Sequence, residues 1–240
     1  VFRDPNAWYH FVVAYDSAQA VEANRVKMYV NGSQITDFHT GGSYGYPAQD
    51  LEGGINDDVQ HNIGLTTAYG SYPLDGYLAE VHFIDGTALT PTSFGESGDY
   101  GDWKPKEVSG VTYGTNGFYL DFADAADLGD DESGEGNDFT ENNITADDQM
   151  LDTPTNNFAT LNPLDRVDSV LSEGNLHATG AGDSWNTVRS TFAMPSGSWY
   201  AEFYCKAGID NGNNHVGIAQ QSEALTGISG SVALGTSYTS

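Results

Sequence analysis

The sequence is poor in cysteine and has no long apolar runs. Cys205 is the only cysteine among 240 residues, so no disulfide can form within the chain, which excludes a disulfide-stabilised secreted module. Cys205 lies in an alternating, strand-like pattern, and we expect it to be a small buried apolar residue. No apolar run approaches the length of a membrane-spanning helix, and no signal peptide is recognisable. The chain opens abruptly at Val1, so we interpret it as a piece of a longer polypeptide.

Basic residues are also scarce. Eight Lys and Arg stand against 34 Asp and Glu, which gives a formal net charge of −26. Such a surface repels nucleic acid and anionic membranes, because phosphate binding needs clustered Lys and Arg. We therefore expect no nucleic-acid partner and no insertion into a membrane. The acidity itself is compatible with solubility, with a salty environment or with bound divalent cations.

Glycine and aromatic residues are plentiful, and short strand-like segments alternate with Gly, Asn and Asp turns. This pattern predicts an all-β protein of antiparallel β-sandwiches with long loops and very little helix. Residues 8–16 (WYHFVVAYD) have two largely apolar faces, as in a central strand. Residues 25–32 (RVKMYVNG) place Val26, Met28 and Val30 on one face and end in Asn-Gly, a typical hairpin turn. Residues 90–94 (TPTSF) predict a single helical turn.

Three motifs follow one another in a fixed order: KMYVNG at residues 27–32, GYLAEV at 76–81 and ALTP at 88–91. Together they resemble the C-terminal half of a laminin-G/concanavalin A-like jelly roll, over roughly residues 1–95. The resemblance implies a binding or scaffold module rather than a catalyst. We therefore expect a first domain at residues 1–110 that is incomplete at its N-terminus.

Residues 111–165 form an acidic region rich in Asn, Asp and Gly, with a strand at residues 117–122 (GFYLDF) and a linker-like stretch near its end. The sequence leaves open whether this region is a separate domain or contributes a strand to the first sandwich. From about residue 170 onward, the motifs GSWYAEF (197–203) and VGIA (216–219) resemble the start of a SPRY-type β-sandwich, so a third domain is expected at 166–240, incomplete at its C-terminus.

The order of these units is similar to that in structural and fibre proteins of marine bacterial viruses. The resemblance implies a tail-fibre, spike or capsid-surface protein on the virion, made of β-sandwich modules and partnered by copies of itself or by other virion proteins. A bacterial secreted or cell-surface adhesin with calcium-binding, lectin-like modules is the first alternative. The second is a non-catalytic part of a carbohydrate-active enzyme.

The chain carries no pattern typical of catalysis. Glycoside hydrolysis needs two carboxylates across a cleft, but Glu80 and Asp85 merely flank one strand, and Glu80 fills a scaffold position of the jelly-roll pattern. No Gly-x-Ser-x-Gly turn and no phosphate-binding loop occur. The histidines form no His-x-x-x-His pair, and His10 and His82 are expected to be ordinary sheet residues. We therefore predict a non-enzymatic protein.

Two sets of residues are candidate ligand sites. Calcium prefers carboxylate, amide and backbone oxygens, so the Gly-rich acidic loop at residues 130–138 is a candidate calcium site. Its ligands would be Asp130, Asp131, Glu132, Asn137 and Asp138, although a solvated acidic turn explains the same pattern. Sugars stack on exposed aromatic rings, so the loop residues Tyr44, Tyr46, Tyr69 and Tyr72 are candidate contacts for a host-surface glycan. Packing of these rings on the sandwich rim is the alternative.

Overall fold

A computed structural model describes much of the chain. The described residues are 7–38, 45–57, 59–66, 72–74, 76–99, 101–180, 186–194, 196–205, 216–219, 224–225 and 232–233. The predicted fold class is confirmed: these residues form short antiparallel strands, and their helices are three 3-10 turns of three residues each. No helix within the described residues is long and apolar enough to span a membrane.

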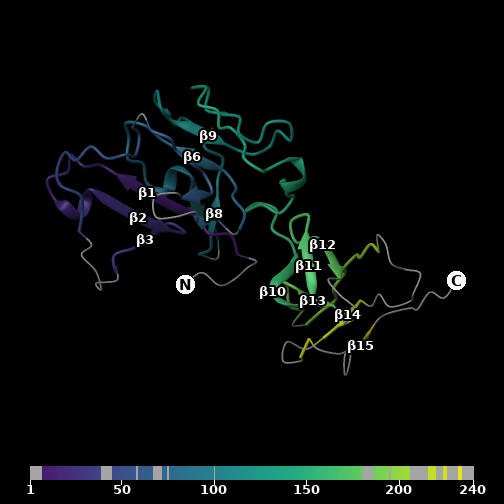
Figure 1. Cartoon of the computed structure of the whole chain (residues 1–240). Coiled ribbons are helices and arrows are strands. Elements are labelled where there is room, and N and C mark those ends of the chain that lie inside the picture. The colour runs from purple at the N-terminus through teal and green to yellow at the C-terminus, as the bar shows by residue number, and fades with distance from the viewer. Residues whose placement is uncertain are drawn as a thin grey trace. The chain divides into compact units, whose positions relative to one another are not determined.

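The described chain separates into two compact units. Trp8–Asn157 form the first, here called the N-terminal unit, and the described residues from Phe158 onward form the C-terminal unit. Figure 1 labels most of their strands. The elements of the N-terminal unit are β1 (Phe11–Tyr15), η1 (Glu22–Asn24), β2 (Val26–Val30), β3 (Ser33–Gln34), β4 (Leu65–Thr66), β5 (Tyr72–Pro73), β6 (Val81–Phe83), η2 (Pro91–Ser93), β7 (Gly95–Ser97), β8 (Trp103–Pro105), β9 (Phe118–Leu120) and η3 (Ala146–Asp148).

The first sheet follows from the hairpin signal in the sequence. β1 pairs with β2 so that Phe11 lies opposite Val30 and Tyr15 opposite Val26, and β2 turns through Asn31 and Gly32 into β3. Both turn residues have positive φ, 47° and 76°, as a tight hairpin turn requires. β3 is short, because only Ser33 and Gln34 pair with β2.

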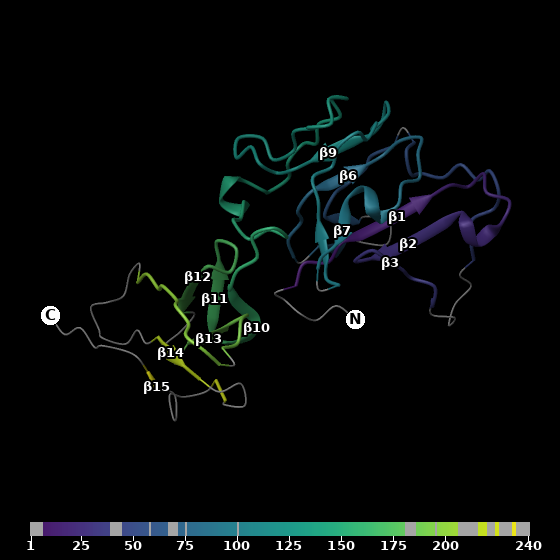
Figure 2. The same ribbon diagram turned by 180° about the vertical axis from the view of Figure 1, so that it is seen from behind.

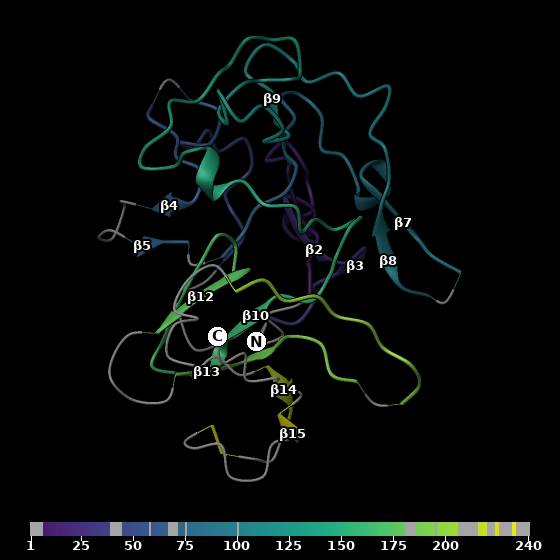
Figure 3. The same ribbon diagram turned by 90° about the vertical axis from the view of Figure 1, so that its right-hand side faces the viewer.

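The acidic region contributes a strand to the N-terminal unit. β9 pairs antiparallel with β6, with Val81 opposite Leu120 and Phe83 opposite Phe118, and Figure 2 shows the two strands side by side. A second hairpin joins β7 to β8 (Figure 3). Residues 111–157 thus belong to the same compact unit as the first sheet.

The C-terminal unit is a set of two-stranded ladders. β10 pairs with β13, β11 with β12, and β14 with β15. Their bounds are β10 (Leu161–Val167), β11 (Ser169–Ser172), β12 (His177–Gly180), β13 (Thr187–Ser190), β14 (Gly217–Ile218) and β15 (Val232–Ala233). Arg189 donates from Nη1 to both carboxylate oxygens of Asp165, at 3.1 and 3.0 Å, which links β13 to β10.

The expectation of a buried cysteine is wrong. Cys205 is exposed, and residues 198–205 form no strand in the structure. Without a paired strand in this segment, no sheet face covers the thiol.

Candidate functional site

The acidic loop, residues 130–138, is built around one carboxylate. Asp131 is only 7% exposed. Its Oδ1 accepts hydrogen bonds from the backbone N–H groups of Tyr119 (2.8 Å) and Ser133 (2.9 Å). Its Oδ2 accepts from the Ser133 hydroxyl and from the Asn137 N–H, both at 2.9 Å. Each oxygen therefore has two protein donors, and the carboxylate holds β9 and both ends of the turn together.

The other polar groups of the acidic loop also bind within the protein. Asp138 Oδ1 accepts a hydrogen bond from the Asp131 N–H, and the Asn137 side-chain amide donates to the carbonyls of Thr115 and Gly117. Two residues of the turn, Gly134 and Gly136, have positive φ, which lets the chain fold back over Asp131.

These hydrogen bonds stabilise the charged form of Asp131. Burial by itself would raise the pKa of the carboxyl, but four hydrogen bonds to the carboxylate bring it below its usual value. Asp131 is therefore an anion whose charge is neutralised by protein dipoles. It does not require a cation for compensation.

The structure thus brings Asp131, Asn137 and Asp138 together but directs their polar atoms toward the protein. Of these three residues, only Asp138 is exposed. Glu132, the next residue after Asp131, is exposed as well. Among the described residues, no group of three or more His, Cys, Asp or Glu side chains is placed to hold a metal ion. Calcium binding at Asp130, Asp131, Glu132, Asn137 and Asp138 stays a prediction.

The candidate glycan-binding tyrosines are only partly described. Tyr44 and Tyr69 lie outside the described residues. Tyr46 precedes Pro47 in a loop, whereas Tyr72 lies on β5, opposite Thr66, and is 61% exposed. An exposed ring such as that of Tyr72 is available for stacking on a sugar. The role of the four tyrosines as glycan contacts also stays a prediction.

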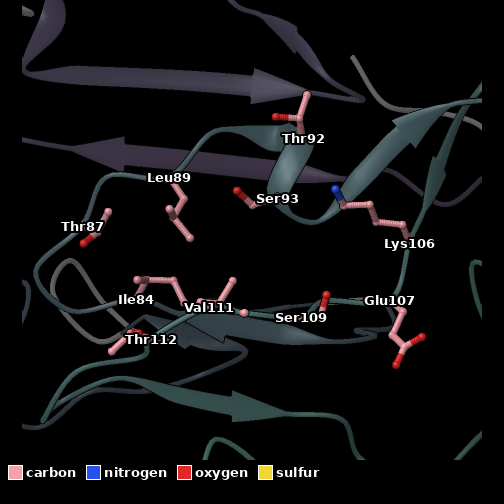
Figure 4. A pocket seen from close by; sticks show the side chains of 11 residues that line it. Ile84, Thr87, Leu89, Thr92, Ser93, Lys106, Glu107, Ser109, Val111 and Thr112 are labelled. Atoms are coloured by element: carbon pink, nitrogen blue, oxygen red, sulfur yellow. The ribbon is translucent and has the colours of Figure 1, made fainter.

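A pocket that the sequence did not predict lies in the N-terminal unit between η2 and the segment after β8 (Figure 4). Its volume is about 630 Å³, within the range of small-molecule sites. Its wall consists of Ile84, Thr87, Leu89, Thr92, Ser93, Lys106, Glu107, Ser109, Gly110, Val111 and Thr112. The hydroxyl groups come from segments up to 25 residues apart along the chain, so no local motif could reveal them.

A pair of like charges stands at the end of the β6–β9 ladder. Glu80 and Asp121 each lie one residue beyond the Val81–Leu120 pair. Burial and the charge of Asp121 raise the pKa of Glu80. Asp85, at the other end of β6, accepts hydrogen bonds from the Asn56 side chain and the Asn116 N–H. The two hydrogen bonds give Asp85 a structural role, whereas the scaffold role of Glu80 stays a prediction.

Six rings form an aromatic cluster between the first sheet and the β6–β9 pair: His10, His82, Phe94, Trp103, Tyr113 and Tyr119. His82 stacks on Tyr119 with ring centroids 4.2 Å apart, and its Nδ1 lies 2.7 Å from the Tyr113 hydroxyl. Trp103 Nε1 donates to His10 Nδ1 at 2.9 Å. Phe94 lies between the histidines, at 6.3 Å from His10 and 5.2 Å from His82. His82 lies on β6, as predicted. The expectation of a strand position is wrong for His10, because β1 begins at Phe11.

Comparison with known proteins adds no identification. No protein-family model, no curated protein and no solved structure matches this chain at a significant level.

Proposed function

We propose that this chain is a non-enzymatic structural module that assembles with copies of itself at the surface of a virion, as part of a fibre, spike or capsid decoration. A cell-surface adhesin is the alternative setting for the same module. One observation carries the proposal: the first sheet has an exposed apolar face.

This outer face is defined by the pairing of β1 with β2. Directly opposed residues point to the same side of a sheet, so alternate pairs of the β1–β2 register share this side. Val13 is 60% exposed and Phe11 56% exposed. The outer face consists of Phe11, Val13 and Tyr15 from β1 and Val26, Met28 and Val30 from β2.

The N-terminal unit has a small apolar core, which gives the exposed face its significance. Among its described residues, only Leu120 and Leu128 are buried apolar residues of the core. A chain with so small a core gains stability by covering apolar surface on a neighbour, at roughly 25 cal/mol per Å². Contiguous exposed apolar patches are typical of protein interfaces.

The proposed occupant of this face is a second copy of the chain, and that copy is itself anionic. The chain has a net charge of −26, so two copies repel each other at long range and associate only where short-range apolar contact outweighs that repulsion. Salt screens the repulsion over about 10 Å at 0.1 M ionic strength. Self-association through the outer face should therefore strengthen as salt is added.

Sedimentation velocity over a wide concentration range tests the proposal. The wild type should form a defined oligomer that is favoured by salt. Val13→Asp places a charge on the outer face and should give monomers. Val170→Asp is the matched control, because Val170 lies on β11 and is 53% exposed; this variant should assemble normally. A wild type that stays monomeric at every concentration and salt level would contradict the proposal.

Glycan binding is a second candidate function, favoured by the pocket near η2. Three of its hydroxyl side chains, Ser93, Ser109 and Thr112, have no hydrogen-bond partner among the described protein groups, and they surround the apolar Leu89 and Val111 (Figure 4). Hydroxyl groups around an apolar patch suit a saccharide, which has polar edges and apolar C–H faces. One lysine and one glutamate in the wall give no net charge, which favours a neutral glycan over a sialylated or sulfated one.

A glycan array probed with the whole chain tests this candidate. Ser109→Trp should fill the pocket and abolish binding, whereas Ser97→Trp, at an exposed site on β7 outside the pocket, should leave binding intact. An array without signal for neutral glycans would remove the candidate and leave the assembly proposal standing.

A further inference from the structure

The contact between His10 and Trp103 fixes the protonation state of a histidine. An indole N–H can only donate a hydrogen bond, so the His10 Nδ1 that receives it at 2.9 Å carries a lone pair. His10 is therefore neutral, with its proton on Nε2. Adding a proton to Nδ1 removes the acceptor and breaks this hydrogen bond.

The same contact joins segments 93 residues apart in the sequence. On one side, His10 and Asn31 exchange hydrogen bonds: the His10 N–H donates to the Asn31 side chain and the Asn31 N–H to the His10 carbonyl, each at 2.8 Å. On the other side, the Trp103 ring on β8 occupies a space bounded by Gly32 and Gly95, where a Cβ atom would lie 2.4 and 2.7 Å from ring atoms. The indole thus connects the first hairpin to the β7–β8 hairpin.

A second histidine in the aromatic cluster is equally unsuited to protonation. His82 Nε2 is buried and has no hydrogen-bond partner among the described residues, so an imidazolium N–H there would lack an acceptor. Burial, and secondarily the charge of His10, lower the pKa of His82 to about 4. Burial also lowers the pKa of His10.

Among the residues that the structure describes, the groups that face these histidines include no acidic partner for an imidazolium. Around His10 they are Phe94, Trp103 and His82. Around His82 they are Phe94, Tyr113 and Tyr119, and the pKa of Tyr119 is raised to about 12 by burial and by Glu80, Asp121, Tyr113 and Glu132, in that order. Burial and the charges of Asp131 and Glu80 also raise the pKa of Tyr113. These carboxylates act on the tyrosines from the border of the cluster, and the tyrosines stay neutral at physiological pH.

We propose that the aromatic cluster is an acid-sensitive contact: protonation of His10 and His82 breaks the hydrogen bond to Trp103 and separates the first hairpin from β8. Above neutral pH the contact is closed. In mild acid the unfolded or open form takes up the protons first, so the open form gains population as pH falls. This behaviour is independent of the assembly and glycan proposals.

The indole N–H resonance of Trp103 in the ¹⁵N-labelled whole chain is a direct readout. The chain has four tryptophans, and Trp103→Phe assigns the signal. As pH falls from about 6.5, the ordinary histidine value, to about 4, the resonance should move toward the position of a solvent-exposed indole. His10→Gln keeps an acceptor oxygen that does not titrate, so this variant should hold the resonance near its neutral-pH position. His177→Gln removes a half-buried histidine of the C-terminal unit and should leave the pH response unchanged.

The imidazole Cε1–H signals of the wild type provide a test that does not depend on any variant folding. The pKa values of His10 and His82 should lie below the ordinary histidine value of about 6.5. A Trp103 resonance that ignores pH in the wild type, or that responds equally in His10→Gln, would overturn the proposal. Titration of His10 and His82 at the ordinary histidine value would also overturn it.

Discussion

Replacing Asp131 by asparagine changes one oxygen of the most densely bonded side chain in the acidic loop. The carboxylate accepts four hydrogen bonds, two at each oxygen. Asparagine has the same shape but one oxygen, and its NH₂ group must face two of the four donors. The better orientation turns the NH₂ toward the Ser133 hydroxyl, which can rotate to accept. The Asn137 N–H then faces another donor and is left without a partner.

The expected cost can be worked out from these contacts. A buried donor without a partner costs about 1–3 kcal/mol. The bonds that survive lose the assistance of the negative charge, which makes up about 1 kcal/mol of a charged hydrogen bond. Because Asp131 is 7% exposed, water can compensate little of this loss. We therefore expect Asp131→Asn to lower the free energy of unfolding of the N-terminal unit by about 2–4 kcal/mol.

Hydrogen exchange at the Tyr119 amide, which donates to Asp131, measures this effect locally. At about 1.4 kcal/mol per factor of ten, protection should fall roughly 30- to 1,000-fold. Glu135→Gln removes the same charge from an exposed residue of the same loop and should leave protection unchanged. The pKa of Asp131 is lower in the folded chain than the ordinary 3.8. The difference between wild type and Asp131→Asn should therefore be full above that pH and disappear as pH falls through the folded-state pKa.

Equal loss of protection in Asp131→Asn and Glu135→Gln would refute this reasoning, because the effect would then follow net charge. No loss in Asp131→Asn would show that the four hydrogen bonds contribute nothing to stability.

Four further outcomes are expected. In urea melts, Gly32→Ala should lower the free energy of unfolding by more than about 2 kcal/mol, because the new Cβ would lie 2.4 Å from the Trp103 ring. Gly86→Ala is the control: Gly86 also has a positive φ but borders open space, so this variant should lower it by about 1 kcal/mol. Leu120→Ala, at a site 1% exposed, should cost about 2–5 kcal/mol. Glu80→Gln should raise the melting temperature slightly at neutral pH, because it removes a charge that burial and Asp121 disfavour. In acid, where Glu80 is protonated, the melting temperatures of the variant and the wild type should agree. A chelator should leave the melting temperature unchanged, because the Asp131 oxygens already have donors; a drop would restore the calcium hypothesis.

The strands that the sequence predicted well are those with a local signal. The alternation of residues 8–16 and 25–32 located β1 and β2, and the Asn-Gly pair located the turn from β2 to β3. The expectation of a central strand at residues 8–16 is wrong, because β1 lies at the edge of its sheet in the described residues. Of the strand expected at residues 117–122, only Phe118–Leu120 pair with β6. Strand length depends on whether a partner lies alongside, and local pattern carries no information about that.

In the candidate sites, too, the sequence indicated local features but not contacts between distant residues. The acidic composition of residues 130–138 suggested calcium, but the donors to Asp131 include the Tyr119 amide, which lies 12 residues earlier. The Asp-x-Ser-Gly stretch that begins at Asp131 is a local signal for a side-chain-stabilised turn, and it could have favoured the structural interpretation. Thr87 and Thr112 line the same pocket but are 25 residues apart in the sequence. A local sequence pattern therefore could not predict that they lie in one pocket.

The space that holds the Trp103 ring has a consequence for how this chain can diverge. Gly32, Gly95 and Trp103 are far apart in the sequence but share one volume, so substitutions at the three positions are not independent. A smaller residue at 103 would make room for alanine at 95, whereas position 32 would still favour glycine because its φ is +76°. Among related sequences, residues 95 and 103 should therefore vary together, while residue 32 should stay glycine wherever tryptophan occupies 103.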